Sequence, residues 1–316
     1  MAPDASQPAT TASSSTASPS TQQSPSNIVL WVHPRSTSTM FECMLLARSD
    51  FQVHHEPMGE AWYYGDERAS TRFTDEQRKA SGNADATYAQ SWREVAKPHP
   101  TLRTFSKDMA QYLMDLNKPK GTVAPSFGDD AVTTPNNPTR IPTAELLQPH
   151  INHTFLIRHP QKAVPSYARL CYPGAPTGFD YFDPAEMGYK ELRLLFDFIR
   201  EETGRTPLLI ESEELLAMPV KVVRGWCEHV GIEFTEGMLE WDDAPETRTH
   251  FEKWTGFHDD AAASKGVGRQ SPAQDAPSRQ QQKKQEPKPL SPELQQAVDG
   301  CMDDYEYLRS FAHHDW

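Results

Sequence analysis

The sequence predicts an α/β fold in which helices cover a central parallel sheet. Short runs of β-branched and aromatic residues alternate with helical patterns, which is the order that βαβ units produce. With 316 residues the chain is long enough for one large domain or two small ones. No internal repeat is present, and the alternation continues through one body, so we expect a single domain over residues 27–269.

The first strand is the clearest element, because residues 27–33 read NIVLWVH and lead through a short turn into an apolar helical pattern at 39–47. Four further strands are expected at residues 52–55, 102–105, 154–158 and 207–210. Four further helices are expected at residues 108–116, 161–170, 184–202 and 220–230. Ser291 followed by Pro292 marks the start of a last helix that should end near Leu308.

Two segments have a composition that does not favour a packed structure. Residues 1–26 consist mostly of Ser, Thr, Pro, Ala and Gln, and residues 270–289 repeat this bias. Such segments have too little apolar surface to offset the entropy of ordering them. We therefore expect a disordered leader over 1–26, a flexible linker over 270–289, and a C-terminal helix within 290–316 that packs on the domain.

The balance of charged residues limits the kinds of partner that the protein is expected to bind. The chain has 31 Lys and Arg against 44 Asp and Glu, a formal charge of −13, and no apolar run approaches the roughly 18 residues that span a membrane. Nucleic acids and anionic membranes require a basic surface, so neither is an expected partner. Four widely separated cysteines and the absence of Lys and Arg from the first 34 residues lead us to expect a cytoplasmic protein.

The turn after the first strand is rich in donors for an anion. It reads HPRSTST over residues 33–39 and combines one fixed cation, Arg35, with four consecutive hydroxyl side chains at the start of a helix. A polar loop in which Ser38 only caps the helix is an equally good interpretation at this stage. The G-x-x-x-x-G-K-[ST] pattern of magnesium-dependent nucleotide hydrolysis is absent.

This turn resembles the phosphosulfate loop of sulfotransferases that use 3'-phosphoadenosine 5'-phosphosulfate (PAPS). Thr37 stands where that family usually has glycine, and His55-Glu56-Pro57 resembles the end of its second strand. The resemblance implies a P-loop-type three-layer α/β/α fold, PAPS as co-substrate and no metal. It also implies that five residues of the turn contact the phosphosulfate, namely Arg35, Ser36, Thr37, Ser38 and Thr39.

Two more basic elements resemble the residues with which the family binds the 3'-phosphate. Arg158 follows the fourth strand and Ser166 lies eight residues later, so both can converge on one anion. Lys265 and Gly266 lie in a basic loop near the end of the domain. The alternatives are that Arg158 pairs with a surface carboxylate and that 264–269 is a flexible edge of the linker.

Sulfuryl transfer needs a cation at the leaving group and a base for the acceptor. Arg35 is the candidate for the first role, because its guanidinium stays charged. The resemblance implies that Glu56 is the base. His55 is the second catalytic candidate, and three further competitors are His54, Lys107 and Asp108.

The function implied by the resemblance is sulfuryl transfer from PAPS to a hydroxyl or amine of a small-molecule acceptor, in specialised metabolism, by a monomer or homodimer. An aromatic stretch at residues 56–65 lines the acceptor pocket or belongs to the core. Two alternatives stay open: a non-catalytic P-loop-derived nucleotide-binding or scaffold protein, and a divergent P-loop kinase or hydrolase.

Overall fold

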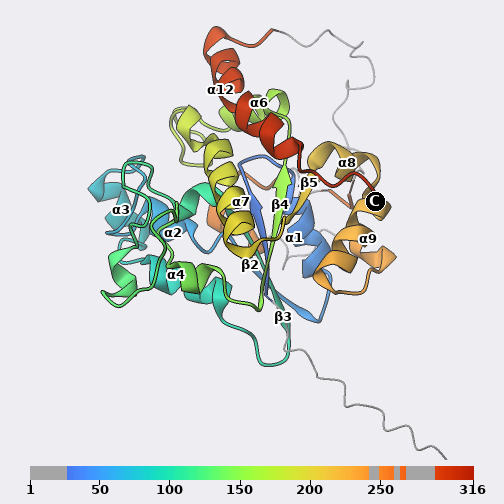
Figure 1. Cartoon of the computed structure of the whole chain (residues 1–316). Coiled ribbons are helices and arrows are strands. Elements are labelled where there is room, and N and C mark those ends of the chain that lie inside the picture. Colours follow the sequence, from blue (N-terminus) through green and yellow to red (C-terminus); the bar gives the residue numbers. More distant parts are fainter. Residues whose placement is uncertain (1–26, 242–248, 260–263, 268–288) are drawn as a thin grey trace, which may run out of the picture.

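A five-stranded parallel sheet forms the centre of the molecule. The computed structural model describes residues 27–241, 249–259, 264–267 and 289–316 (Figure 1). The strands, in the spatial order β2-β3-β1-β4-β5, all pair in parallel, which confirms the expected sheet. Their bounds are β1 Asn27–Val32, β2 Phe51–His55, β3 Arg103–Met109, β4 Ile151–Ile157 and β5 Leu208–Glu211.

The apolar sequence of β1 follows from its central position. β1 lies between β3 and β4, where Asn27 pairs with Thr104 on one side and Ile151 on the other, and all six of its residues are buried. A strand covered on both faces must be apolar on both. The turn that follows β1 therefore starts from the centre of the sheet.

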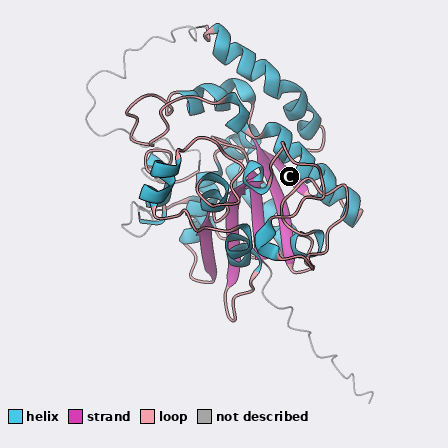
Figure 2. Cartoon of the chain, turned by 90° about the vertical axis from the view of Figure 1, so that its left-hand side faces the viewer, coloured by secondary structure: helices cyan, strands magenta, loops and turns pink. Residues whose placement is uncertain are grey.

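Helices cover both faces of the sheet, as expected. In Figure 1, α4 and α7 lie on one side of the strands and α1 and α9 on the other, and Figure 2 shows the strands side by side with helices in front of them. The α-helices are α1 Ser38–Leu46, α2 Gly59–Tyr63, α3 Asp75–Ser81, α4 Tyr88–Ala96, α5 Thr143–Leu146, α6 Pro160–Ala168, α7 Tyr189–Thr203, α8 Ser212–Ala217, α9 Pro219–Val230 and α12 Pro292–Arg309. Short 3₁₀ helices include η1 Ala110–Leu113, η2 Pro125–Phe127, η3 Pro184–Met187, η4 Glu236–Leu239 and η5 Glu252–Trp254.

The helix expected at residues 108–116 is wrong. β3 continues to Met109 because Lys107 and Asp108 pair with Leu30 and Trp31 of the central strand, and only a 3₁₀ turn follows. The polar pair suggested the end of a strand, but both side chains are buried and have partners inside the protein. The expected helix at 184–202 is also divided, at Gly188, into η3 and α7.

The C-terminal helix α12 begins where Ser291 and Pro292 predict, and the Ser291 hydroxyl accepts a hydrogen bond from the amide of Leu294 at 3.3 Å. It packs against α6 and α7. The predicted leader and all of the predicted linker except Pro289 lie outside the described residues. Among the described helices, none combines the length and apolar character needed to cross a bilayer.

His153, on β4, is held neutral by its contacts. Its Nδ1 accepts a hydrogen bond from the Trp31 indole at 2.9 Å, and its Nε2 donates to the Leu146 carbonyl at 3.0 Å. Burial lowers the pKa of His153 to about 4. The unfolded chain takes up a proton below the ordinary histidine pKa and the folded chain does not, so the contribution of His153 to stability is lost as the pH falls.

We expect this loss to amount to about 2 kcal/mol between about pH 7 and about pH 5. Denaturant unfolding of wild type and His153→Gln at both pH values isolates the contribution of His153 to the pH dependence of stability. The glutamine amide keeps a donor and an acceptor but does not titrate. The variant should lose about 2 kcal/mol less stability on acidification than wild type. Equal losses in the two proteins would contradict the assignment.

Candidate functional site

The turn between β1 and α1 has the backbone shape of an anion-binding loop. Arg35 and Thr37 have positive φ angles of 63° and 72°, and Ser36 between them does not. Such alternation turns successive amides toward one side and makes a concave site for an anion. Thr37 is the N-cap of α1 and its side chain forms no capping hydrogen bond, whereas Ser38 is the first residue of the helix and so does not have the capping role considered from the sequence.

The conformation of Thr37 explains why glycine is usual at this position. A positive φ is costly for a β-branched residue, by roughly 1–2 kcal/mol. The hydroxyl of Thr37 lies 2.6 Å from that of Ser212 and also donates to the Ser36 carbonyl. Removal of the hydroxyl should therefore lower stability, whereas relief of the strain in the backbone should raise it.

Two substitutions separate these effects. Thr37→Ala and Thr37→Gly both delete the hydroxyl, but only glycine adopts the positive φ without strain. We expect Thr37→Gly to be more stable than Thr37→Ala by about 1 kcal/mol in thermal or denaturant unfolding. An alanine variant as stable as the glycine variant would contradict the strained conformation.

Arg35, Arg158 and Ser166 meet at this turn, as the sequence predicts. The Arg35 Nε donates to the Ser166 hydroxyl at 3.0 Å, and one Arg158 amino group donates to the Arg35 carbonyl at 2.9 Å. The ring of His33 joins the two strand ends, because its Nε2 accepts from the Arg158 amide at 3.0 Å and its Nδ1 contacts the Pro34 carbonyl. Strands β1 and β4 and helix α6 thus contribute side chains to one place.

Two buried donors at the turn lack a partner among the described residues. These are the Ser36 hydroxyl, on a residue with no exposed surface, and the Nε of Arg158. Burial lowers the pKa of Arg158 from its ordinary value, although the charge of Glu213, which pairs with Lys162 at 3.1 Å, acts in the opposite direction. A guanidinium Nε and a hydroxyl that are buried without an acceptor are costly, so the site fits an anionic group.

Lys265 and Gly266 have surroundings that differ from those of the turn. Gly266 forms an antiparallel bridge with Glu240, and a Cβ at its position would lie 2.4 Å from the Leu239 carbonyl oxygen. Lys265 is exposed. Between described residues, no hydrogen bond or ion pair joins either residue to the turn, and their contact with the 3'-phosphate stays a prediction.

A buried cluster of charges lies next to the turn. Its carboxylates belong to Glu42 on α1 and to Glu56 after β2, and its cation is Lys107 on β3. The Lys107 ammonium donates to Glu56 Oε1 and lies 3.4 Å from Glu42 Oε2. The His55 Nδ1 lies 2.8 Å from Glu42 Oε1, and its Nε2 lies 4.0 Å from Glu56 Oε1.

The protonation states in the cluster depend on each other. Burial opposes the charge on Glu42, yet His55 and Lys107 hold the pKa of this carboxyl well below its ordinary value. Burial would also lower the pKa of Lys107, but the charges of Glu42 and Glu56 raise it. Burial lowers the pKa of His55. These directions favour an ionised Glu42 beside the Lys107 ammonium, and burial favours the neutral form of His55.

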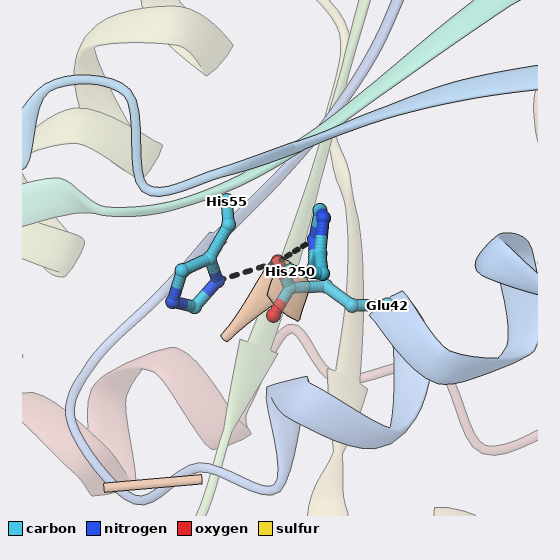
Figure 3. A group of neighbouring side chains, drawn as sticks. All are labelled: Glu42, His55 and His250. Carbon is cyan, nitrogen blue, oxygen red and sulfur yellow. Dashed lines mark hydrogen bonds and ion pairs between the residues drawn. The ribbon is translucent and has the colours of Figure 1, made fainter. Parts of the chain in front are cut away.

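Two histidines that the sequence analysis missed complete the cluster. Figure 3 shows His250 and His55 on either side of the Glu42 carboxylate, where the His250 Nε2 lies 3.6 Å from Glu42 Oε1. The His258 Nδ1 lies 2.9 Å from the hydroxyl of Thr39, so this residue connects the cluster with the turn. No motif surrounds these histidines in the sequence, and contacts over about 200 residues bring them here.

The cluster also has the donor types of a metal centre. Glu42 with His55 and His250, and His55 with Glu56 and His258, each place three ligand atoms within 4.8 Å of one another. The Lys107 ammonium already contacts both carboxylates, and a second positive charge would be repelled at this short range. These charges favour a neutral polar group, rather than a divalent cation, as the partner of the cluster.

The other base candidates are arranged differently. The two oxygens of Asp108 accept hydrogen bonds from the amides of Met58 and Met109, each at 2.9 Å, and burial raises its pKa well above the ordinary value. His54 points to the other face of β2, where it lines a surface pocket with Arg93. Of the candidates in this region, His55, Glu56 and Lys107 are the ones that meet at the cluster.

Strain coincides with this site. Arg35, Thr37 and Glu56, which has a φ of 47°, are the non-glycine residues with positive φ in the described chain. Residues held in such conformations cluster at functional sites, where the surrounding structure determines them. The aromatic stretch after Glu56 belongs mainly to the core, because the Tyr63 ring is buried against Trp254.

Comparison with known proteins gives a family match and partial relatives. The model of the sulfotransferase family matches residues 27–236, more than half of the chain. Two Arabidopsis thaliana proteins named branched-chain-amino-acid aminotransferase-like protein 2 and 1 are 29% and 30% identical over 93 residues. The match covers 29% of this chain and 15% of each relative, so the chain spans a small part of their length.

Among solved structures, similar chains include three sulfotransferases. The sulfotransferase domain of the Synechococcus PCC 7002 olefin synthase is 17% identical, with a TM-score of 0.40 over 93% of this chain and 97% of that one. The Alicyclobacillus acidocaldarius sulfotransferase is 14% identical, with a TM-score of 0.41 over 72% and 90%. The sulfotransferase domain of the curacin biosynthetic pathway is 16% identical, with a TM-score of 0.40 over 89% and 99%. On the match of the family model over 27–236, the chain belongs to the sulfotransferase family.

Proposed function

We propose that this protein transfers a sulfuryl group from PAPS to a hydroxyl or amine of a small-molecule acceptor. The observation that carries the proposal is the convergence of Arg35, Arg158 and the uncapped start of α1 on one turn with unpartnered buried donors. A phosphosulfate supplies the acceptor oxygens that these donors lack. Arg158 and Ser166 are the proposed ligands of the 3'-phosphate.

The step is an in-line displacement at sulfur. The acceptor oxygen or nitrogen forms a bond to sulfur while the bond from sulfur to the phosphate oxygen breaks, and its electron pair remains on that oxygen. Arg35 and the amides of the turn stabilise the charge that develops on the departing phosphate. The proton of the acceptor passes to a base, for which the cluster beside the turn offers His55 and Glu56.

The contacts favour His55 over Glu56 as the proposed base. Glu56 Oε1 accepts from Lys107, and Oε2 lies 3.4 Å from the Tyr112 hydroxyl, so neighbouring donors engage both oxygens. The Nε2 of His55 is buried and has no hydrogen-bond partner among the described residues. A carboxylate paired with an ammonium is a weaker proton acceptor than an imidazole with a free lone pair.

Incubation of the full chain with PAPS and a panel of alcohols, phenols and amines tests the function. We expect release of 3'-phosphoadenosine 5'-phosphate and a product that carries the mass shift of one sulfate. Binding of PAPS without transfer to any acceptor would instead support a nucleotide-binding or scaffold protein. Magnesium-dependent turnover of ATP, with none of PAPS, would support a divergent kinase or hydrolase and overturn the proposal.

A further inference from the structure

The strongest unexplained feature of the site is a glutamate inside an apolar helix. Glu42 lies on α1 between Phe41 and Cys43, and its side chain has no exposed surface. Burial of a carboxylate costs free energy of folding, and an apolar residue of similar size would fill the same place in the helix without that cost. The closest contact of Glu42 is the Nδ1 of His55, at 2.8 Å.

The chemistry of this contact fixes the tautomer of His55. Because Glu42 is ionised, its oxygens can only accept hydrogen bonds, so the Nδ1 of His55 must donate. A neutral imidazole with its proton on Nδ1 carries its lone pair on Nε2. That nitrogen is the one without a partner among the described residues, and the residue is only 8% exposed.

The surroundings of Nε2 suit the reacting group of the acceptor. Glu56 Oε1 lies 4.0 Å away, and a ring nitrogen of His258 lies within 4.8 Å of a ring nitrogen of His55 and a carboxylate oxygen of Glu56. The Nε2 of His258 also has no hydrogen-bond partner in the described chain. Through its Nδ1, His258 contacts Thr39 in the turn. His55, Glu56 and His258 therefore lie together beside the proposed donor turn.

We propose that Glu42 is a positioning residue that fixes the Nδ1–H tautomer of His55 and directs its Nε2 lone pair to the acceptor hydroxyl or amine. The inference rests on the proposed function. The acceptor proton passes to Nε2 as the new bond to sulfur forms, and the imidazolium is then stabilised by Glu42 on one side and Glu56 on the other. Glu42 itself accepts no proton.

The groups that face His55 set the pH dependence that this role implies. They are Glu42 from α1, Glu56 after β2, Lys107 from β3, and His250, Lys253 and His258 from the segment before residue 260, of which Lys253 donates to the His55 carbonyl at 3.3 Å. Glu42 favours the protonated imidazole, whereas burial and Lys107 oppose it. Loss of the Glu42 charge should therefore move the titration of His55 to lower pH.

Steady-state kinetics of Glu42→Gln tests the role. We expect kcat to fall on the order of 100-fold, with the acid limb of the kcat profile moved to lower pH and the affinity for 3'-phosphoadenosine 5'-phosphate unchanged. Glu214→Gln is the matched control, since Glu214 Oε1 contacts the Nδ1 of His314 at 2.5 Å near the C-terminus. A Glu42→Gln enzyme with the kcat and the acid limb of wild type would overturn the proposal.

Nitrogen-15 NMR of the imidazoles in wild type provides a measurement that needs neither a variant nor an acceptor. We expect the Nδ1–H tautomer for His55, and the Nε2–H tautomer would overturn the proposal even if Glu42→Gln fails to fold. The two hypotheses fail in different ways. An inactive wild type with the Nδ1–H tautomer would contradict sulfuryl transfer, whereas an active wild type with the Nε2–H tautomer would contradict the role of Glu42.

Discussion

Replacement of Lys107 by methionine should lower the free energy of unfolding by about 3–5 kcal/mol, because it leaves buried carboxylates without their cation. Lys107 has no exposed side-chain surface, and Glu42 and Glu56 are its ion-pair partners. Methionine matches the length and volume of the lysine stem, so the substitution removes the charge and little of the packing. Denaturant unfolding near neutral pH measures the loss.

Lys162→Met is the control for this experiment. Lys162 also pairs with a glutamate, Glu213 at 3.1 Å, but its side chain is 55% exposed. Exposed pairs contribute about 0–1 kcal/mol, so this variant should remain close to wild type. If Lys107→Met costs no more than Lys162→Met, the cluster does not depend on the buried ammonium.

His55→Gln should reduce kcat by about 10²–10⁴-fold, the range usual for loss of a general base. The amide keeps a donor for Glu42 but cannot take up the acceptor proton. Binding of 3'-phosphoadenosine 5'-phosphate should be unchanged, because the proposed ligands of the nucleotide, Arg35 and Arg158, remain. Turnover and calorimetric binding of the same protein separate the two effects.

Two further variants decide which residue is the base. Glu56→Gln removes a carboxylate that stabilises the imidazolium but leaves the imidazole, so its kcat should fall less than that of His55→Gln. His54→Gln alters the neighbouring residue on the opposite face of β2 and should be close to wild type. A greater loss for Glu56→Gln than for His55→Gln would return the role of base to Glu56, as the sequence suggested.

Much of the fold could be predicted from the sequence because each strand has a local pattern. The apolar run of β1 and the Ser291-Pro292 start of α12 mark those elements by residues that are adjacent in the chain. β3 is the exception. Its second half carries Lys107 and Asp108, whose burial depends on partners from other elements, and local polarity therefore predicted the wrong end for the strand.

The candidate site could be predicted in part, because some of its residues have a local sequence pattern and others do not. Arg158 and Ser166 are eight residues apart, a spacing that a strand followed by a helix can bring together at one anion, and the structure shows contacts of Arg35 with both of them. Glu42 was detectable as the single charge in the apolar helix that reads STMFECMLL, although the periodicity of a helix does not identify its partner. His250 and His258 reach the cluster only through tertiary structure, and no local pattern indicates them.

Calorimetric titration with 3'-phosphoadenosine 5'-phosphate tests most directly whether the turn after β1 holds the sulfuryl donor. Wild type should bind at micromolar levels, and Arg35→Ala and Arg158→Ala should each weaken binding by about tenfold or more, since each removes a charge-assisted contact. Arg205→Ala, an exposed arginine between α7 and β5, is the control and should bind as wild type does. Unchanged affinity in both Arg35→Ala and Arg158→Ala would contradict the assignment of the site.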